Sequence, residues 1–340
     1  MDPVTQGLLG AAAAQAFFTK QLGRRAWLLG AVGGVLPDAD VFIRSAEDPL
    51  LAAEYHRQFT HALAFIPVGG AVASLPWLVR RRYRTQWKTV LGATTAGYAT
   101  HGLLDACTTY GTQLLWPFST MRVAWNCIAI IDPVFTLLLL AGVVWAARAR
   151  RRAPAAVALG LCLAYLGLGT VQRERALAAQ AQIAAQREHI PPRRTVFPTI
   201  GNLLVWRSLY EAGDRLYSDR IRVPWPGPPQ WTPGATVASV NLEDLPPQAQ
   251  ANPRIVKDFE RFRWFSGGWI ARAPDAPEVI GDARYSLRTE AFEPIWGVRF
   301  DPGSSPPTEW VDRTRDRSLD LGALRREITG RDAAYRALPP

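Results

Sequence analysis

The chain has 340 residues and a formal net charge of +10, from 39 Lys and Arg against 29 Asp and Glu. Its mean hydropathy of −0.03 is that of an ordinary soluble protein. That average conceals two unlike halves, because residues 1–171 are rich in Ala, Leu, Gly and Val, while residues 172–340 are rich in Arg, Asp, Glu, Pro and Trp. The composition predicts a transmembrane domain followed by a soluble one.

Six apolar segments follow one another in the first half. A helix needs about 20 mostly apolar residues to cross a hydrocarbon core of about 30 Å. Two short segments come first, 4–18 and 26–36, and we expect them to pack against the others. Four longer segments then approach the spanning length: 61–79, 89–107, 127–147 and 153–171. The predicted fold is a mainly α membrane bundle of four to six apolar helices.

The positive charge lies in clusters between these segments, at alternate connections. The clusters are Lys20 with Arg24 and Arg25, then Arg80–Arg82 with Arg84 and Lys88, then Arg148 and Arg150–Arg152. The positive-inside rule places all three in the cytoplasm, so residues 37–60, 108–126 and everything after 171 lie outside. Because topology accounts for the clusters, nucleic-acid binding is not expected. The alternative to this multi-pass protein is a soluble protein with buried apolar helices.

Acids and imidazoles gather where four of the segments reach the outer side. Ionisable groups beside apolar segments are costly, and they usually mark a pathway, a buried pair or a metal. The residues, in chain order, are Asp38, Asp40, His56, His61, His101, Asp105 and Asp132. Their convergence on one face is the main functional signal, and we predict that they are metal ligands.

His101 and Asp105 are spaced i, i+4, which on a helix puts them about 40° apart on one face. One ion can contact both, and imidazole with carboxylate suits Zn²⁺, Mn²⁺ or Fe²⁺. A structural hydrogen bond is the alternative. His56 and His61 are about 140° apart on a straight helix, so we expect His56 in a loop and His61 on the first helical turn.

Three further residues have two interpretations each. Asp38 and Asp40 follow Pro37 on a predicted turn, where they either hold a metal or cap a helix. Arg57, between the histidines, either steadies a substrate phosphate or carboxylate or contacts a lipid headgroup. Asp132 precedes Pro133 at a helix start, where it is either a ligand or an N-cap.

These groups favour hydrolysis, since a bound divalent ion activates water and polarises a phosphoryl or carbonyl oxygen. The sequence has no Gly-rich phosphate loop, no GxSxG elbow and no Cys/His nucleophile pair. We therefore predict Asp40, Arg57 and Asp105 as catalytic residues of a metal-dependent hydrolase.

Five motifs carry a family resemblance. They are MDPVTQGLLG, LLGAVGGVLPDAD, YHRQFTHAL, HGLLDACTTYGTQLLWPFS and IIDP, in this order. Over residues 1 to about 150 the chain resembles the membrane-bound metal-dependent hydrolase family, also labelled YdjM-type or LexA-binding inner-membrane-associated hydrolase. The resemblance implies a bacterial inner-membrane location, the seven metal positions named above and, by analogy, phosphoester chemistry. Many relatives have histidine where this chain has Gln6, which implies a weakened or absent second metal position.

The second half predicts an extracytoplasmic α+β domain. Residues 172–190 form a polar helix that continues out of the last span. Residues 195–310 contain short strand-like runs separated by Pro and Gly turns, which is typical of a small antiparallel sheet. A charged tail follows.

The expected function is hydrolysis of a phosphoester or lipid-linked substrate at the outer membrane face, with water activated by Zn²⁺ or, alternatively, Mn²⁺ or Fe²⁺. The expected partners are membrane lipids and that substrate. The rival hypothesis is a non-catalytic regulatory or assembly protein with a structural metal or a structural His/Asp cluster. A transporter is disfavoured, because its polar groups would lie at mid-membrane.

Overall fold

The computed structural model describes residues 1–314 and 320–338, and the chain divides into two compact units. The N-terminal unit contains Met1–Ile43, Tyr55–Thr170 and Ile200–Asn202. The C-terminal unit contains Arg44–Glu54, Val171–Thr199 and the described residues from Leu203 onward. Two short segments, Arg44–Glu54 and Ile200–Asn202, therefore belong to one unit although the residues before and after them in the chain belong to the other. Residues 315–319 and 339–340 of the expected charged tail lie outside the described residues.

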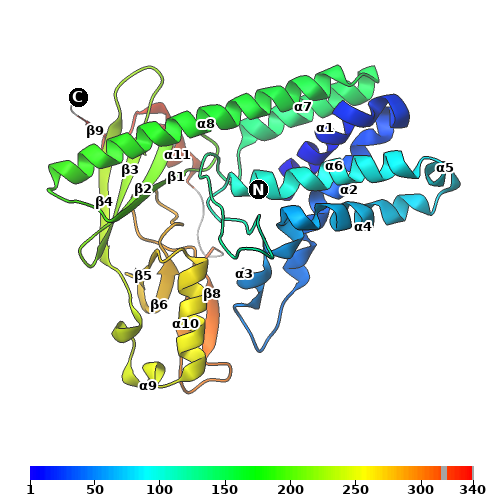
Figure 1. Cartoon of the computed structure of the whole chain (residues 1–340). Coiled ribbons are helices and arrows are strands. Elements are labelled where there is room, and N and C mark those ends of the chain that lie inside the picture. Colours follow the sequence, from blue (N-terminus) through cyan, green and yellow to red (C-terminus); the bar gives the residue numbers. More distant parts are fainter. Residues whose placement is uncertain (315–319, 339–340) are drawn as a thin grey trace. The chain divides into compact units, whose positions relative to one another are not determined.

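The N-terminal unit is helical. Its longer helices are α1 (Pro3–Leu22), α2 (Ala26–Val35), α4 (Ile66–Leu78), α6 (Trp87–Ala106), α7 (Pro133–Ala149) and the first part of α8 (Ala153–Gln186). Shorter turns join them: η1 (Gly23–Arg25), η2 (Leu36–Phe42), η3 (Phe59–His61), η4 (Leu63–Phe65) and α5 (Arg81–Arg84); α3 (Leu51–Tyr55) ends where the unit resumes. Helices α1, α2, α4 and α6 lie side by side (Figure 1).

Local sequence explains where two of these helices begin. Asp2 precedes Pro3, and its carboxylate accepts a hydrogen bond from the Thr5 amide at the start of α1. Asp132 precedes Pro133 and accepts from the Phe135 amide at the start of α7. Aspartate is a favoured N-cap, and proline at the first helical position has no amide hydrogen left unsatisfied.

Glycine allows α2 to pack directly against the backbones of α1 and α6. A Cβ atom on Gly30 would lie 2.1 Å from the carbonyl oxygen of Gly10 on α1. A Cβ atom on Gly97 of α6 would lie 2.2 Å from the carbonyl oxygen of Gly30. No larger residue fits either contact, and such small-residue packing is typical of helices with few polar partners.

The expected bundle of four to six membrane helices is wrong. Among the described residues, one helix, α8, is long and apolar enough to cross a membrane. The stretches Leu51–His61 and Leu63–Leu78 pass the same test only together, as a pair bent by 59°. Helix α7, with 17 residues, reaches only about 26 Å at 1.5 Å per residue. Helix α6 has 20 residues, but threonine, His101 and Asp105 make it too polar.

The C-terminal unit contains two antiparallel sheets instead of one small sheet. The first has the order β1-β2-β3-β4-β9, and the second has the order β5-β6-β7-β8. The strands are β1 (Arg193–Pro198), β2 (Val205–Ala212), β3 (Arg215–Arg222), β4 (Gln230–Ala238), β5 (Ile270–Ala273), β6 (Ala276–Asp282), β7 (Trp296–Phe300), β8 (Thr308–Asp312) and β9 (Arg336–Ala337). The helices are η5 (Leu242–Asp244), α9 (Pro247–Gln250), α10 (Pro253–Phe265) and α11 (Leu321–Thr329).

Strand β2 of the first sheet is covered by other elements on both of its faces. Trp206 packs on Ala176, Ala179 and Ile183 of α8, whose second part lies along the first sheet (Figure 1). On the opposite face, Leu209 packs with Trp269 and Ala271 at the second sheet. The register pairs Leu209 with Thr195 of β1 and with Ser218 of β3. A strand covered on both faces shows no alternation of apolar and polar residues, and VWRSLY is buried throughout.

Candidate metal centre

The predicted acids and imidazoles of the N-terminal unit come from three elements that meet at one place. Asp38 and Asp40 lie on η2, directly after α2. His61 ends η3, and His101 with Asp105 occupies the last turns of α6. Because α2 and α6 are in backbone contact, the end of one helix brings its aspartates to the end of the other.

Four ligand atoms converge there. They are Asp38 Oδ1, His61 Nε2, His101 Nε2 and Asp105 Oδ2, all within 4.8 Å of one another. His101 Nε2 lies 3.2 Å from Asp38 Oδ1, and His61 Nε2 lies 3.2 Å from Asp105 Oδ2. The two remaining imidazole–carboxylate distances are 3.5 Å. Two imidazoles and two carboxylates make the ligand set of a Zn²⁺, Mn²⁺ or Fe²⁺ site.

Three of these four atoms are buried and make no hydrogen bond of good geometry: His61 Nε2, His101 Nε2 and Asp105 Oδ2, of which the last forms an ion pair with Arg57 Nε at 3.0 Å. Buried polar atoms are almost always hydrogen-bonded, because leaving them unpaired is costly. A cation bound between them would satisfy all three. The residues present therefore fit a divalent metal ion.

The other ring nitrogen of His101 shows which nitrogen carries the lone pair. His101 Nδ1 lies 2.6 Å from the carbonyl oxygen of Gly34. A carbonyl oxygen only accepts, so Nδ1 carries the hydrogen, and in the neutral ring Nε2 has a free lone pair. Backbone carbonyls commonly orient metal-binding histidines in this way.

Asp40 orients the other two histidines. Its Oδ1 lies 2.8 Å from His56 Nδ1, and its Oδ2 accepts from the Arg57 amide at 3.0 Å and from Thr60 Oγ1 at 2.8 Å. Because Thr60 donates its hydroxyl to Asp40, it accepts from His61 Nδ1 at 2.9 Å. In the neutral ring, His61 Nε2 therefore has a lone pair that faces the cluster.

The carboxylates are ionised in this setting. Burial raises the pKa of Asp38 and Asp40, but contacts with His101 and His61, or with His56 and His61, hold each pKa below its usual value. Burial likewise raises the pKa of Asp105, but the Arg57 guanidinium, the Met1 ammonium and contacts with His101 and His61 together hold it well below its usual value. Charged carboxylates are the form that binds a cation.

Arg57 is buried beside Asp105. Its Nε lies 3.0 Å from Asp105 Oδ2, and its Nη1 donates to Thr108 Oγ1 at 2.9 Å. Its backbone has φ of 66°, a left-handed conformation that is uncommon outside glycine. The guanidinium also lies over the ring of Tyr110, 4.7 Å from its centroid. The described contacts of Arg57 are thus with the site, and its predicted contact with substrate stays a prediction.

A second group of possible ligands shares Asp38 with the first and adds Asp40 and His56. The structure thus brings together six of the seven predicted metal positions. Asp132 belongs to neither group among the described residues. Its Oδ1 caps α7, and its Oδ2 accepts from the hydroxyl of Tyr165 at 2.9 Å.

A family model matches residues 1–176, which is just over half of the chain, and its description is YdjM inner membrane protein. The chain belongs to the YdjM inner membrane protein family. The family confirms the resemblance seen in the sequence and makes the protein an inner-membrane protein. No curated protein and no solved structure matches the chain. Hydrolysis and metal dependence stay predictions for this YdjM family member.

Gln6 contacts one of the candidate metal ligands, Asp105. Its Nε2 donates to Asp105 Oδ1 at 2.9 Å and to the His101 carbonyl oxygen at 3.3 Å. The Met1 ammonium contacts the same carboxylate oxygen. Gln6 therefore holds Asp105 by a hydrogen bond, at the position where the resemblance implied a histidine in relatives.

Sequence reasoning missed two groups that orient the histidines. The hydroxyl of Thr60 was visible in the sequence between His56 and His61, and its position beside His61 was the available signal. The carbonyl of Gly34 left no signal, because every residue has a carbonyl and only packing shows which one faces His101.

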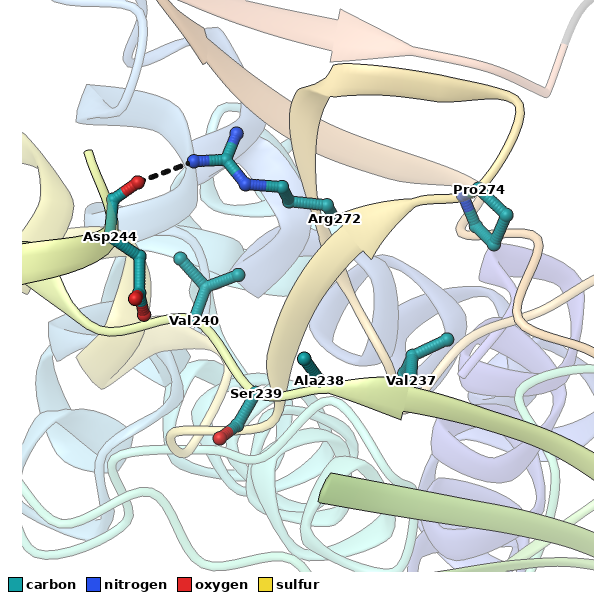
Figure 2. A pocket seen from close by; sticks show the side chains of 7 residues that line it. All are labelled: Val237, Ala238, Ser239, Val240, Asp244, Arg272 and Pro274. Atoms are coloured by element: carbon teal, nitrogen blue, oxygen red, sulfur yellow. Dashed lines mark hydrogen bonds between the residues drawn. The ribbon is translucent and has the colours of Figure 1, made fainter. Parts of the chain in front are cut away.

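A surface pocket of about 490 Å³ lies in the C-terminal unit between the ends of β4 and β5. Figure 2 shows its lining, in which Arg272 donates to the carbonyl oxygen of Asp244 at 2.8 Å. Val237, Val240 and Pro274 make up much of the rest. Its lining has a single acid and no imidazole, so it lacks the groups that hold a metal.

Proposed function

We propose that this YdjM family member is a metal-dependent hydrolase that acts on a phosphoester or lipid-linked substrate. The observation that carries the proposal is the convergence of three buried ligand atoms, none with a hydrogen bond of good geometry, with Asp38 Oδ1. Zn²⁺ is the first expectation from two imidazoles and two carboxylates, with Mn²⁺ or Fe²⁺ as alternatives. When bound, a divalent ion polarises a phosphoryl oxygen and makes water more acidic.

The chain's own residues prepare this site. The Gly34 carbonyl and the Thr60 hydroxyl keep hydrogens on the Nδ1 atoms of His101 and His61, so that both Nε2 atoms face the ligand position. Arg57 and Gln6 hold opposite sides of the Asp105 carboxylate. Two histidines and two acids are thereby fixed before a metal arrives, which lowers the cost of ordering them.

We also propose which side of the membrane the end of α8 faces. Arg148 and Arg150–Arg152 come directly before α8, the one described helix that is long and apolar enough to cross a membrane. By the positive-inside rule these arginines face the cytoplasm, so we place the C-terminal end of α8 on the outer side.

A substitution at His101 tests the proposal. We expect the purified full-length chain to contain a divalent metal and to hydrolyse a phosphodiester or a phospholipid. His101→Ala should weaken metal binding at least about tenfold and remove hydrolysis, since it deletes a ligand. His189→Ala, in the C-terminal unit, is the matched control and should leave both unchanged. A metal-free protein whose hydrolysis survives in His101→Ala contradicts the proposal.

One observation favours a non-catalytic regulatory or assembly protein instead. The Asp105 carboxylate already has a cationic partner in Arg57, and Asp40 has one available in His56. A cluster with its charges compensated in this way can serve as a structural polar core. In that case removal of His101 lowers the thermal stability, and no substrate is hydrolysed with or without metal.

A further inference from the structure

The segment Arg44–Glu54 lies in sequence between two parts of the metal site. Asp40 precedes it, and His56 follows it two residues after Glu54. The chain before and after this segment belongs to the N-terminal unit, but the segment itself belongs to the C-terminal unit. Its ends are tied together at the site, because Asp40 Oδ1 lies 2.8 Å from His56 Nδ1.

One arginine of α10 holds the middle and the end of this segment. Arg261 donates from Nη1 and Nη2 to the two carboxylate oxygens of Asp48, at 2.9 and 3.0 Å. It also donates from Nε and Nη2 to Glu54 Oε2, at 3.0 and 2.6 Å. Bidentate contacts of this kind fix geometry as well as add energy. Arg261 therefore restrains the segment at two points six residues apart.

Arg261 is itself held in place. Its Nη1 donates to Asp258 Oδ1 at 2.9 Å, and Asp258 is fully buried. Asp258 Oδ2 accepts from Thr308 of β8 at 2.8 Å and from Arg254 at 3.0 Å. Helix α10 is anchored by a buried apolar face that includes Phe259 and Phe262.

A second arginine of α10 also contacts this segment. Arg254 Nη2 donates to the carbonyl oxygen of Glu47 at 3.2 Å, next to Asp48. Within the segment, Leu50 is 2% exposed and so is packed rather than free in solution. Burial raises the pKa of Asp48, but hydrogen bonds from Arg261 lower it overall, so the pair is ionised at neutral pH. The segment is held by charge pairs and by packing.

We propose that Arg261 is a positioning residue for the metal site. By restraining Asp48 and Glu54, it limits the freedom of the chain that carries Asp40 and His56, and Asp40 in turn orients His61. Ordering these residues before metal binding removes an entropic cost that a loose segment would impose on the bound state. The inference rests on the proposed metal site and adds that a residue of the C-terminal unit tunes its affinity.

Metal affinity of the full-length chain tests this inference, with Zn²⁺ and Co²⁺ as the probes. Arg261→Gln should weaken the affinity for both ions by about five- to tenfold, in the range of coupling between distinct sites. It should also change the visible absorption of the Co²⁺-loaded protein, which reports ligand geometry. Arg299→Gln is the matched control, because it removes an Arg–Glu pair with Glu309 in the same unit and should change neither readout.

Asp48→Asn gives a second, milder variant that keeps the bonds of Arg261 to Glu54 and Asp258. The double variant Asp48→Asn with Arg261→Gln should be no weaker than Arg261→Gln alone, because both changes break one contact. Unchanged metal affinity and Co²⁺ absorption in both single variants overturn the inference while leaving the proposed function intact. A wild-type chain that binds neither ion overturns both.

Discussion

The two units bury charged side chains for different purposes. In the N-terminal unit, the buried Asp, Arg and His side chains are Asp40, Arg57, His61, His101 and Asp105, all at the metal site, together with the helix cap Asp132. In the C-terminal unit they are spread through the fold and include Arg207, Asp219, Arg220, Asp258, Asp282 and Arg284. Most of these make ion pairs, such as Arg284 with Asp282 at 2.7 Å.

This difference follows from how each unit is packed. The N-terminal helices approach through glycine until backbone touches backbone, which leaves little space for long charged side chains between them. The sheets of the C-terminal unit instead surround their buried charges with carbonyl and carboxylate acceptors. Arg207, for example, donates to the carbonyl oxygens of Ala283, Thr289 and Ala291. A buried charge is therefore informative in the first unit, whereas a buried charge with structural partners is routine in the second.

The largest expected effect on stability concerns the apolar core of the C-terminal unit. Trp206→Ala removes a fully buried ring between α8 and the first sheet and should cost about 3–5 kcal/mol of unfolding free energy. Trp225→Ala is the control, since Trp225 is 68% exposed. Chemical denaturation of both variants measures the difference. Equal stability of the two variants would show that the first sheet does not depend on this core.

A smaller effect tests glycine packing on the N-terminal side. Gly97→Ala should destabilise the protein by about 3 kcal/mol, because the backbone carbonyl of Gly30 cannot move aside as a side chain can. Gly160→Ala, on α8, meets nothing within 4 Å and should be neutral or slightly stabilising through helix propensity. Thermal unfolding in detergent compares the pair. A Gly97 variant as stable as the Gly160 variant refutes direct backbone contact between α2 and α6.

The smallest expected effect concerns Asp40 and distinguishes a loss of metal affinity from a loss of folded structure. Asp40→Asn keeps the shape of the side chain but removes the charge that orients His56 and His61. We expect metal affinity to fall about ten- to a hundredfold, or about 1.4–2.7 kcal/mol, with native secondary structure retained. Titration with Zn²⁺ and circular dichroism measure the two properties. Full affinity in this variant would mean that Thr60 and the backbone suffice to orient His61.

Much of the candidate site could be read from the sequence, because its residue types are rare and placed with regular spacing. His101 and Asp105 are four apart on one helix, and the chain turns between His56 and His61 so that their ring centroids lie 5.8 Å apart. Asp132 shared the same signals, but its neighbour in space is Tyr165. An aspartate before proline has the same sequence pattern whether it caps a helix or binds a metal.

The membrane topology could not be read as reliably. Apolar composition is shared by helices that contact lipid and by helices that pack against protein. Helix length and breaks in the chain, such as the one between His61 and Leu63, separate the two cases. That the C-terminal unit lies outside the cytoplasm stays a prediction.

The sequence alone determined the apolar and polar halves and the residue types of the site, because these depend on local chemistry. Only the tertiary structure decided that the Gly34 carbonyl orients His101, that Asp40 orients two histidines, and that Arg44–Glu54 belongs with α10. Such contacts join residues far apart in the chain. They depend on how helices pack, which no local pattern of residues records.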